Sequence, residues 1–141
     1  MCLHINDNDL LFKKSLDSLI TQIDKNFEFL LIADGELTES QENIISEYKR
    51  IIIKEGIEFK LIRNEYCLGH GMTRHIGIIN MSSDIIVIND SDDISHPDRL
   101  KETRKAFELF DEISIFTTSV IEKDILKDKF FGIKSVPLNH E

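Results

Sequence analysis

Residues 85–93 read Ile-Ile-Val-Ile-Asn-Asp-Ser-Asp-Asp, and this stretch decides the fold class. Its first four residues, 85–88, are all apolar, which is typical of a central strand buried on both faces of a parallel sheet. Three carboxylates, those of Asp90, Asp92 and Asp93, follow within four positions. Ligands of open α/β sheets bind at the carboxyl ends of the strands, so the stretch predicts a buried strand that leads into a ligand site.

The rest of the chain alternates short apolar runs with longer amphipathic segments, which predicts an α/β fold with a mostly parallel sheet flanked by helices. Further strands are predicted at residues 2–5, 27–33, 58–63, 113–121 and 130–136. Four helices are predicted. The first covers residues 10–22, the second follows a capping box of Thr38 and Gln41, and the third runs from about residue 72 to Asn80. The fourth begins at Ser95, with inward side chains at Leu100, Ala106, Phe107 and Phe110. Because no repeat or linker interrupts the pattern, residues 1–141 are expected to form a single domain.

Composition narrows the classes of function. The 141 residues include 26 acidic and 17 basic side chains, and the resulting net charge of -9 has the wrong sign for bulk attraction to a nucleic acid. Two cysteines, Cys2 and Cys67, are too few for a disulfide framework and lack the usual zinc spacing. No secretory signal is visible and every apolar run is far shorter than the ~20 residues of a spanning helix, so a cytoplasmic protein is expected.

The acidic cluster of Asp90, Asp92 and Asp93 favours a metal-binding site. Carboxylates packed this closely repel one another, and a hard divalent cation such as Mg²⁺ or Mn²⁺ among their oxygens relieves the repulsion. A solvated acidic loop whose last residues cap the next helix is the alternative that the pattern leaves open. Spacing excludes an EF-hand, since Ile94, Ser95 and Lys101 stand where Asp or Asn, Gly and Glu are required. The P-loop and serine-hydrolase signatures are absent too, so the sequence does not support nucleophilic catalysis.

Other polar residues flank the predicted ligand edge. Asp34 follows the strand at 27–33 and precedes Gly35; an acid there often bonds a ligand's base or ribose, although Asp-Gly is also an ordinary turn. Arg63, Arg74 and Arg99 lie near these loops, where a cation beside a bound metal suits a diphosphate. An ordinary surface cation is the alternative for each arginine.

Five stretches, taken in order, resemble the family 2 glycosyltransferases of bacterial polysaccharide synthesis. They are residues 12–22 (FKKSLDSLITQ), 27–38 (FEFLLIADGELT), 68–77 (LGHGMTRHIG), 90–93 (DSDD) and 97–100 (PDRL). The second resembles the family's Asp-Gly turn, the third its glycine-containing turn and helix, and the fourth its Asp-x-Asp-Asp motif. The resemblance covers most of the chain, to about residue 138, and the ordered set is far more specific than any one motif.

The resemblance implies a GT-A (Rossmann-like) fold and inverting sugar transfer from a nucleoside diphosphate sugar in polysaccharide or cell-surface glycan synthesis. It implies that Asp34 hydrogen-bonds the nucleotide base, with uracil favoured, while Asp90 and Asp92 lie along the ribose and a metal-bridged diphosphate. Asp92 is expected to be the direct ligand of Mn²⁺ or Mg²⁺, with Asp90 beside it. Arg74 is expected near the nucleotide, and Arg99 is expected to support the acidic loop or the phosphates.

The sequence also departs from the family. His75 replaces the usual Asn, and the acceptor-binding half that carries the family's catalytic acid does not follow, so we expect a single nucleotide-sugar-binding domain truncated at its C-terminal side. Glu141 lacks the context of a catalytic base, and no catalytic residue is assigned.

Two hypotheses about function stay open. The first is a glycosyltransferase-type domain that takes a UDP sugar and a glycan or lipid-linked acceptor, at the inner face of the membrane if it is peripheral. The second is a non-catalytic remnant or interaction module with the same fold, and a homo-oligomer or a complementing chain would supply the missing half. A receiver-like phosphotransferase is disfavoured because the acidic cluster follows a late strand.

Overall fold

The computed structural model describes residues 1–124, 127 and 129–135, in two compact units formed by residues 1–104 and 105–141. The first unit contains a parallel sheet with the strand order β1-β2-β3. Its strands are β1 (Cys2–Leu3), β2 (Glu28–Asp34) and β3 (Glu58–Asn64). This parallel sheet and its covering helices confirm the predicted GT-A-like α/β fold class.

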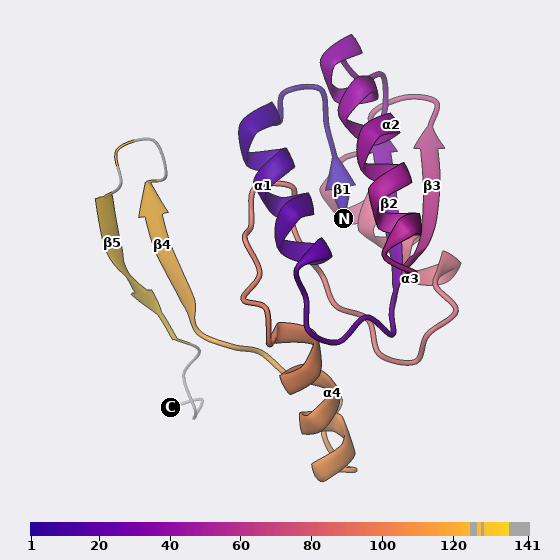
Figure 1. Cartoon of the computed structure of the whole chain (residues 1–141). Helices are drawn as coiled ribbons and strands as arrows, with labels where there is room; N and C mark the ends of the chain where they lie inside the picture. The colour runs from indigo at the N-terminus through magenta and orange to yellow at the C-terminus, as the bar shows by residue number, and fades with distance from the viewer. Residues whose placement is uncertain (125–126, 128, 136–141) are drawn as a thin grey trace. The chain divides into compact units, whose positions relative to one another are not determined.

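Helices cover both faces of this sheet. They are α1 (Asp9–Ile20), α2 (Glu39–Lys54) and α3 (His70–Asn80), and α4 (Arg99–Leu109) follows them in the chain. In Figure 1, α1 and α2 lie on one face of the sheet and α3 lies on the other. The predicted capping box is confirmed, because the Thr38 hydroxyl accepts from Gln41 N–H at 3.1 Å and the Gln41 side chain accepts from Thr38 N–H at 3.0 Å.

The core is centred on β2, whose residues from Phe29 to Asp34 are all buried. Successive side chains of a strand point to opposite faces. Phe29 and Leu31 therefore share one face and belong to a single apolar cluster with buried side chains of α1 and α2, which are Phe12, Leu16, Leu19, Ile44, Ile45, Tyr48 and Ile52. Burial of each large apolar side chain contributes about 1.5–3 kcal/mol, so this layer is a major stabilising part of the unit.

The predicted central strand at residues 85–88 is wrong. No part of this segment is a strand, and two of its side chains are far from buried, with Ile86 37% and Ile88 49% exposed. A strand needs a hydrogen-bonded neighbour, and β1 offers only two paired residues, Cys2 and Leu3. An apolar run shows that a segment suits burial but does not show that a sheet edge is available to it.

The last predicted helix starts later than expected. The predicted start at Ser95 is wrong, because the Ser95 hydroxyl donates to Asn89 Oδ1 at 2.6 Å, and α4 begins at Arg99. Of its predicted inward residues, Phe110 is 54% exposed.

In the second unit, β4 (Val120–Asp124) and β5 (Lys129–Lys134) form an antiparallel pair. The strand predicted at 113–121 is therefore displaced toward the C-terminus. The end of the strand predicted at 130–136 lies outside the described residues, as does the stretch 137–141.

Candidate functional site

The acidic loop at 89–93 is built around Asn89, which is 5% exposed. Its amide Nδ2 donates to Ser15 Oγ of α1 at 2.9 Å and to the backbone oxygen of Asp90 at 3.0 Å. Its Oδ1 accepts from Ser95 Oγ and from Arg99 Nη1, each at 2.6 Å. This buried amide therefore joins α1, the acidic loop and the start of α4, and it fixes where the carboxylates that follow it lie.

Arg99, a predicted site residue, supports this loop. Besides its bond to Asn89, Nη1 donates to Ser95 Oγ at 2.8 Å and Nη2 donates to the backbone oxygen of Ile88 at 2.8 Å. Three acceptors around one planar guanidinium define its orientation. The structure therefore shows that Arg99 stabilises the acidic loop through hydrogen bonds to Ile88, Asn89 and Ser95.

Arg74 and Asp90, two further predicted residues, are brought together. Arg74 Nη2 of α3 lies 2.6 Å from Asp90 Oδ1 and 2.9 Å from Asp90 Oδ2. His70, one helical turn earlier, places its Nε2 3.5 Å from the same Oδ1. Since residues four apart share a helix face, α3 presents two basic side chains to one carboxylate.

Asp92 and Asp93 are the exposed carboxylates of the loop. Asp92 is exposed, and no described residue forms a hydrogen bond or ion pair with its carboxylate. Desolvation, followed by the negative charges of Asp90 and Asp92, raises the pKa of Asp93. The positive charge of Arg99 opposes this shift.

The donor set of the loop fits a magnesium-like ion. Within the described residues, no three His, Cys, Asp or Glu side chains converge as a ready-made metal cluster. Mg²⁺ is usually held by one or two carboxylates, with waters and substrate phosphates as its other ligands. In this loop Asp92 is the carboxylate without a described partner, whereas both oxygens of Asp90 accept from Arg74.

Asp34, predicted to contact the base, is 5% exposed at the end of β2. Its Oδ1 accepts from Asn64 Nδ2 at 2.9 Å and Leu68 N–H at 2.8 Å, and its Oδ2 accepts from Gly69 N–H at 3.0 Å and Cys67 Sγ at 3.4 Å. These four bonds use about all the lone-pair positions of a carboxylate. Asp34 therefore shapes the turn that leads into α3.

The charge of Asp34 is strongly stabilised. Burial acts to raise the pKa of this carboxyl, but hydrogen bonds from Leu68 N–H and from the side chains of Asn64, Thr73 and Cys67 outweigh it and lower the pKa. A base N–H that approaches Asp34 would meet a carboxylate at any physiological pH.

Sequence reasoning missed the residues that link the first loop to the acidic one. Asp7 Oδ2 accepts from His4 N–H at 2.9 Å and from Ser91 Oγ at 2.8 Å. Asp7 lies in a polar turn directly after the first strand, and this position was the one feature of the sequence that could have marked it as a site residue. Its contact with Ser91 brings the ends of β1 and of residues 85–88 to the same edge as Asp34.

These contacts define a class of protein. Asp34 ends the parallel strand β2, and α/β proteins bind nucleotides at the ends of such strands. The family model described as "Glycosyl transferase family 2" matches residues 8–130. The chain belongs to glycosyltransferase family 2, and the resemblance noted in the sequence is confirmed.

Similar proteins agree with this assignment. An uncharacterized glycosyltransferase of Methanocaldococcus jannaschii is 34% identical over 107 residues, which are 73% of this chain and 34% of the relative. An uncharacterized glycosyltransferase of Haemophilus influenzae is 26% identical over 137 residues, 97% of this chain and 49% of the relative. The UDP-Gal:alpha-D-GlcNAc-diphosphoundecaprenol beta-1,3-galactosyltransferase of Escherichia coli is 28% identical over 102 residues, 72% of this chain and 35% of the relative.

The chain spans at most about half the length of these curated relatives, since the aligned part is 34% to 49% of each. Within the part of the chain that the structure describes, we find no helix with the length and hydropathy to cross a membrane.

Proposed function

We propose that this chain binds the nucleoside diphosphate of a sugar donor, with UDP as the nucleotide, at the edge formed by Asp34, Arg74, Asp90 and Asp92. The observation that carries the proposal is the pairing of Arg74 with Asp90, which fixes a guanidinium beside the acidic loop. In a chain of net charge -9, an anionic diphosphate needs local cations. Arg74 and a divalent ion bound at the loop would supply them.

Each carboxylate has a distinct proposed part. Asp92, exposed and without a partner among the described residues, is the direct ligand of Mn²⁺ or Mg²⁺, and Asp90 lies beside it along the ribose and diphosphate. Such a cation would stabilise the charge that develops on the departing diphosphate. Arg99 has an indirect part, because it does not contact the ligand but stabilises the loop that carries both carboxylates.

Asp34 is proposed to meet the uracil base. The hydrogen bond from Cys67 Sγ, at 3.4 Å, is the longest of the four bonds to its carboxylate. A thiol is a weak donor, so an imide N–H of the base can replace it at Oδ2 without disturbing the backbone bonds from Leu68 and Gly69. Base recognition and the shape of the loop would then depend on the same carboxylate.

The acceptor is proposed by analogy. The printed name of the Escherichia coli relative specifies transfer to a diphosphoundecaprenol-linked sugar, and a glycan or lipid-linked acceptor, met at the inner face of the membrane, is proposed here on that ground. We assign no catalytic base.

Calorimetric titration of the full chain with UDP, with and without Mn²⁺, tests the proposal. We expect saturable binding that tightens at least about tenfold with the metal, which corresponds to ~1.4 kcal/mol. GDP provides the control for base recognition and should bind more weakly. A folded protein that binds UDP in neither condition would refute the proposal, and metal-dependent binding without transfer or hydrolysis of a UDP sugar would favour the non-catalytic alternative.

A further inference from the structure

Residues 90–93 form a tight turn within the acidic loop. The N–H of Asp93 donates to the backbone oxygen of Asp90 at 3.2 Å, so Ser91 and Asp92 are the two central residues of the turn. Ser91 is only 8% exposed, whereas Asp92 is exposed. The turn therefore directs the Ser91 side chain into the protein and presents Asp92 to solvent.

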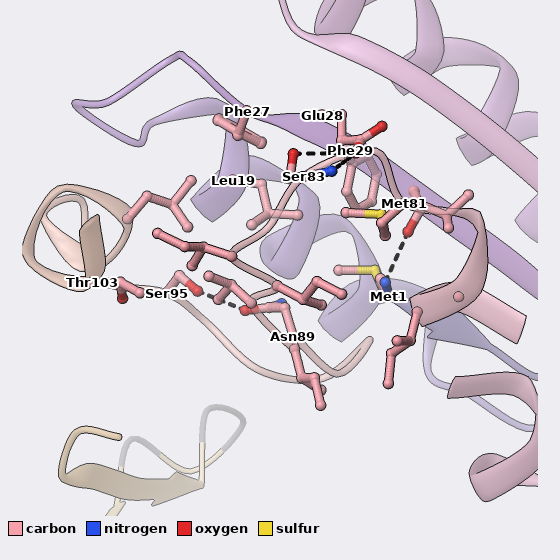
Figure 2. A pocket seen from close by; sticks show the side chains of 18 of the residues that line it. Met1, Leu19, Phe27, Glu28, Phe29, Met81, Ser83, Asn89, Ser95 and Thr103 are labelled. Atoms are coloured by element: carbon pink, nitrogen blue, oxygen red, sulfur yellow. Dashed lines mark hydrogen bonds between the residues drawn. The ribbon is translucent and has the colours of Figure 1, made fainter. Parts of the chain in front are cut away.

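Ser91 anchors this turn to the first loop of the chain. Ahead of the turn, the loop is fixed by Asn89, which accepts from Ser95 Oγ at the wall of the cavity beside β2 (Figure 2). Within the turn, Ser91 Oγ donates to Asp7 Oδ2 at 2.8 Å, and no described residue bonds to the carboxylate of Asp92. The place of Asp92 therefore depends on the contact that its neighbour Ser91 makes with Asp7.

Asp7 is itself held firmly, by residues outside the acidic loop. Its Oδ2 also accepts from His4 N–H at 2.9 Å, and its own N–H donates to the backbone oxygen of His4 at 2.9 Å. Gln41 of α2, which is fully buried, donates from Nε2 to the backbone oxygens of His4 and Asp7 at 3.0 and 3.3 Å. A carboxylate oxygen that accepts from two donors on a fixed backbone has a defined position.

We propose that Asp7 is a positioning residue of the candidate site, which acts through Ser91 to fix the turn that presents Asp92 to a divalent cation. This inference rests on the proposed function, because it concerns the same bound metal and nucleotide. Both bonds at Asp7 Oδ2 need an acceptor oxygen, but neither needs a negative charge. An amide oxygen accepts hydrogen bonds as a carboxylate oxygen does, so asparagine can replace Asp7 in this role.

The Mn²⁺-dependent gain in UDP affinity, measured by calorimetry on the full chain, tests the proposal. Ser91→Ala removes the donor and Asp7→Leu removes the acceptor, so each should reduce a tenfold gain to about threefold or less. Asp7→Asn keeps an acceptor oxygen and should keep the gain. The control is Ser40→Ala, which removes a hydroxyl that donates to Asp9 away from the acidic loop and should also keep the gain.

Solvent exchange of the Asp93 amide, followed by ¹⁵N NMR without UDP or metal, reports on the turn itself. It should accelerate at least about threefold in Ser91→Ala and in Asp7→Leu, and remain unchanged in Asp7→Asn. If Asp7→Leu does not fold, Ser91→Ala still provides the test, because it leaves the bonds between Asp7 and His4 in place.

Three results would overturn the positioning role. They are a full metal-dependent gain in Ser91→Ala, unchanged Asp93 exchange in that variant, and loss of the gain in Asp7→Asn, which would show that the charge of Asp7 acts on the cation directly. Failure of the proposed function is distinguished from these results, because the unsubstituted chain would then bind no UDP in either condition.

Discussion

Arg74 Nη2 lies within hydrogen-bonding distance of both carboxylate oxygens of Asp90, at 2.6 and 2.9 Å. The pair joins α3 to the acidic loop, and both side chains are about one-third exposed, at 36% and 33%. Nε of Arg74 is buried without a hydrogen-bond partner among the described residues. The guanidinium is therefore directed by one strong contact, the one that its Nη2 makes with Asp90.

Replacement of Arg74 should damage binding more than folding. A partly exposed ion pair contributes only about 0.2–1 kcal/mol, so Arg74→Met should lower the free energy of unfolding by no more than that. Loss of a cation at the phosphates should weaken UDP binding by at least about tenfold. Arg50→Met, which removes an exposed arginine from α2, is the control for the change in net charge. Unaltered UDP affinity in Arg74→Met would remove this residue from the site.

Asp34 should be important for stability and for the turn at 64–69. Asp34→Asn replaces acceptor lone pairs with an N–H₂ group that faces the donors of Leu68 or Gly69, so we expect a loss of about 1–3 kcal/mol in the free energy of unfolding. Hydrogen exchange at these two amides should accelerate in the variant. Unchanged exchange at both would contradict the role assigned to this carboxylate.

The pH dependence at Asp34 follows from its lowered pKa. The carboxylate contributes stability above the unfolded pKa of about 3.9, and the contribution is lost as the pH falls through the lower value of the folded state. The difference in unfolding free energy between the unsubstituted chain and Asp34→Asn should therefore be constant from pH 7 to 5 and shrink only in stronger acid.

Glu28 should act as a structural clamp. Its Oε1 accepts from the backbone N–H groups of Ser82 and Ser83 at 2.6 and 3.1 Å, and its Oε2 lies 2.5 Å from Lys60 Nζ. The hydrogen bond from Lys60, opposed by desolvation and assisted by Ser82, lowers the pKa of Glu28 to about 2.

Glu28→Gln should cost about 1–2 kcal/mol in unfolding free energy at pH 7. That difference should begin to fall below the unfolded pKa of about 4.3 and disappear as the pH drops through the folded value. Denaturation curves at several pH values measure it, with the exposed Glu47→Gln of α2 as the matched control. A pH-independent difference would contradict the clamp.

Arg99 should tolerate no replacement by lysine. Its three acceptors, Asn89 Oδ1, Ser95 Oγ and the backbone oxygen of Ile88, surround a planar fork that a single ammonium cannot match. Arg99→Lys should therefore resemble Arg99→Met in losing metal-dependent UDP binding, while Lys101→Met at an exposed position nearby should bind normally. Full rescue by lysine would show that charge alone matters at this position.

The sequence predicted the elements that depend on local chemistry. The capping box of Thr38 and Gln41 predicted the start of α2, and the apolar run at 27–33 predicted a strand, which the structure confirms as β2. Local patterns were sufficient there because each signal lies within the element it specifies. The resemblance likewise identified the family, because an ordered set of motifs carries more information than any one of them.

Prediction from the sequence failed where the structure of a segment depends on contacts with residues far away in the chain. Residues 85–88 are apolar enough for a central strand, but the strand state requires a paired edge, and β1 pairs only at Cys2 and Leu3. The partners of Asp34 come from residues 64–69, about 30 positions away, and the buried amide of Asn89 bonds to Ser15 on α1. No local period reveals such long-range hydrogen bonds.

Asp92 is proposed to bind a divalent cation that couples to the nucleotide, and the Mn²⁺-dependent gain in UDP affinity measures this coupling directly. Calorimetry should give a gain of about tenfold or more in the unsubstituted chain and in Asp111→Asn, an exposed control. Asp92→Asn removes one carboxylate charge and should reduce the gain to none, with UDP binding in the absence of metal unchanged. The same gain in Asp92→Asn as in the unsubstituted chain would contradict the account.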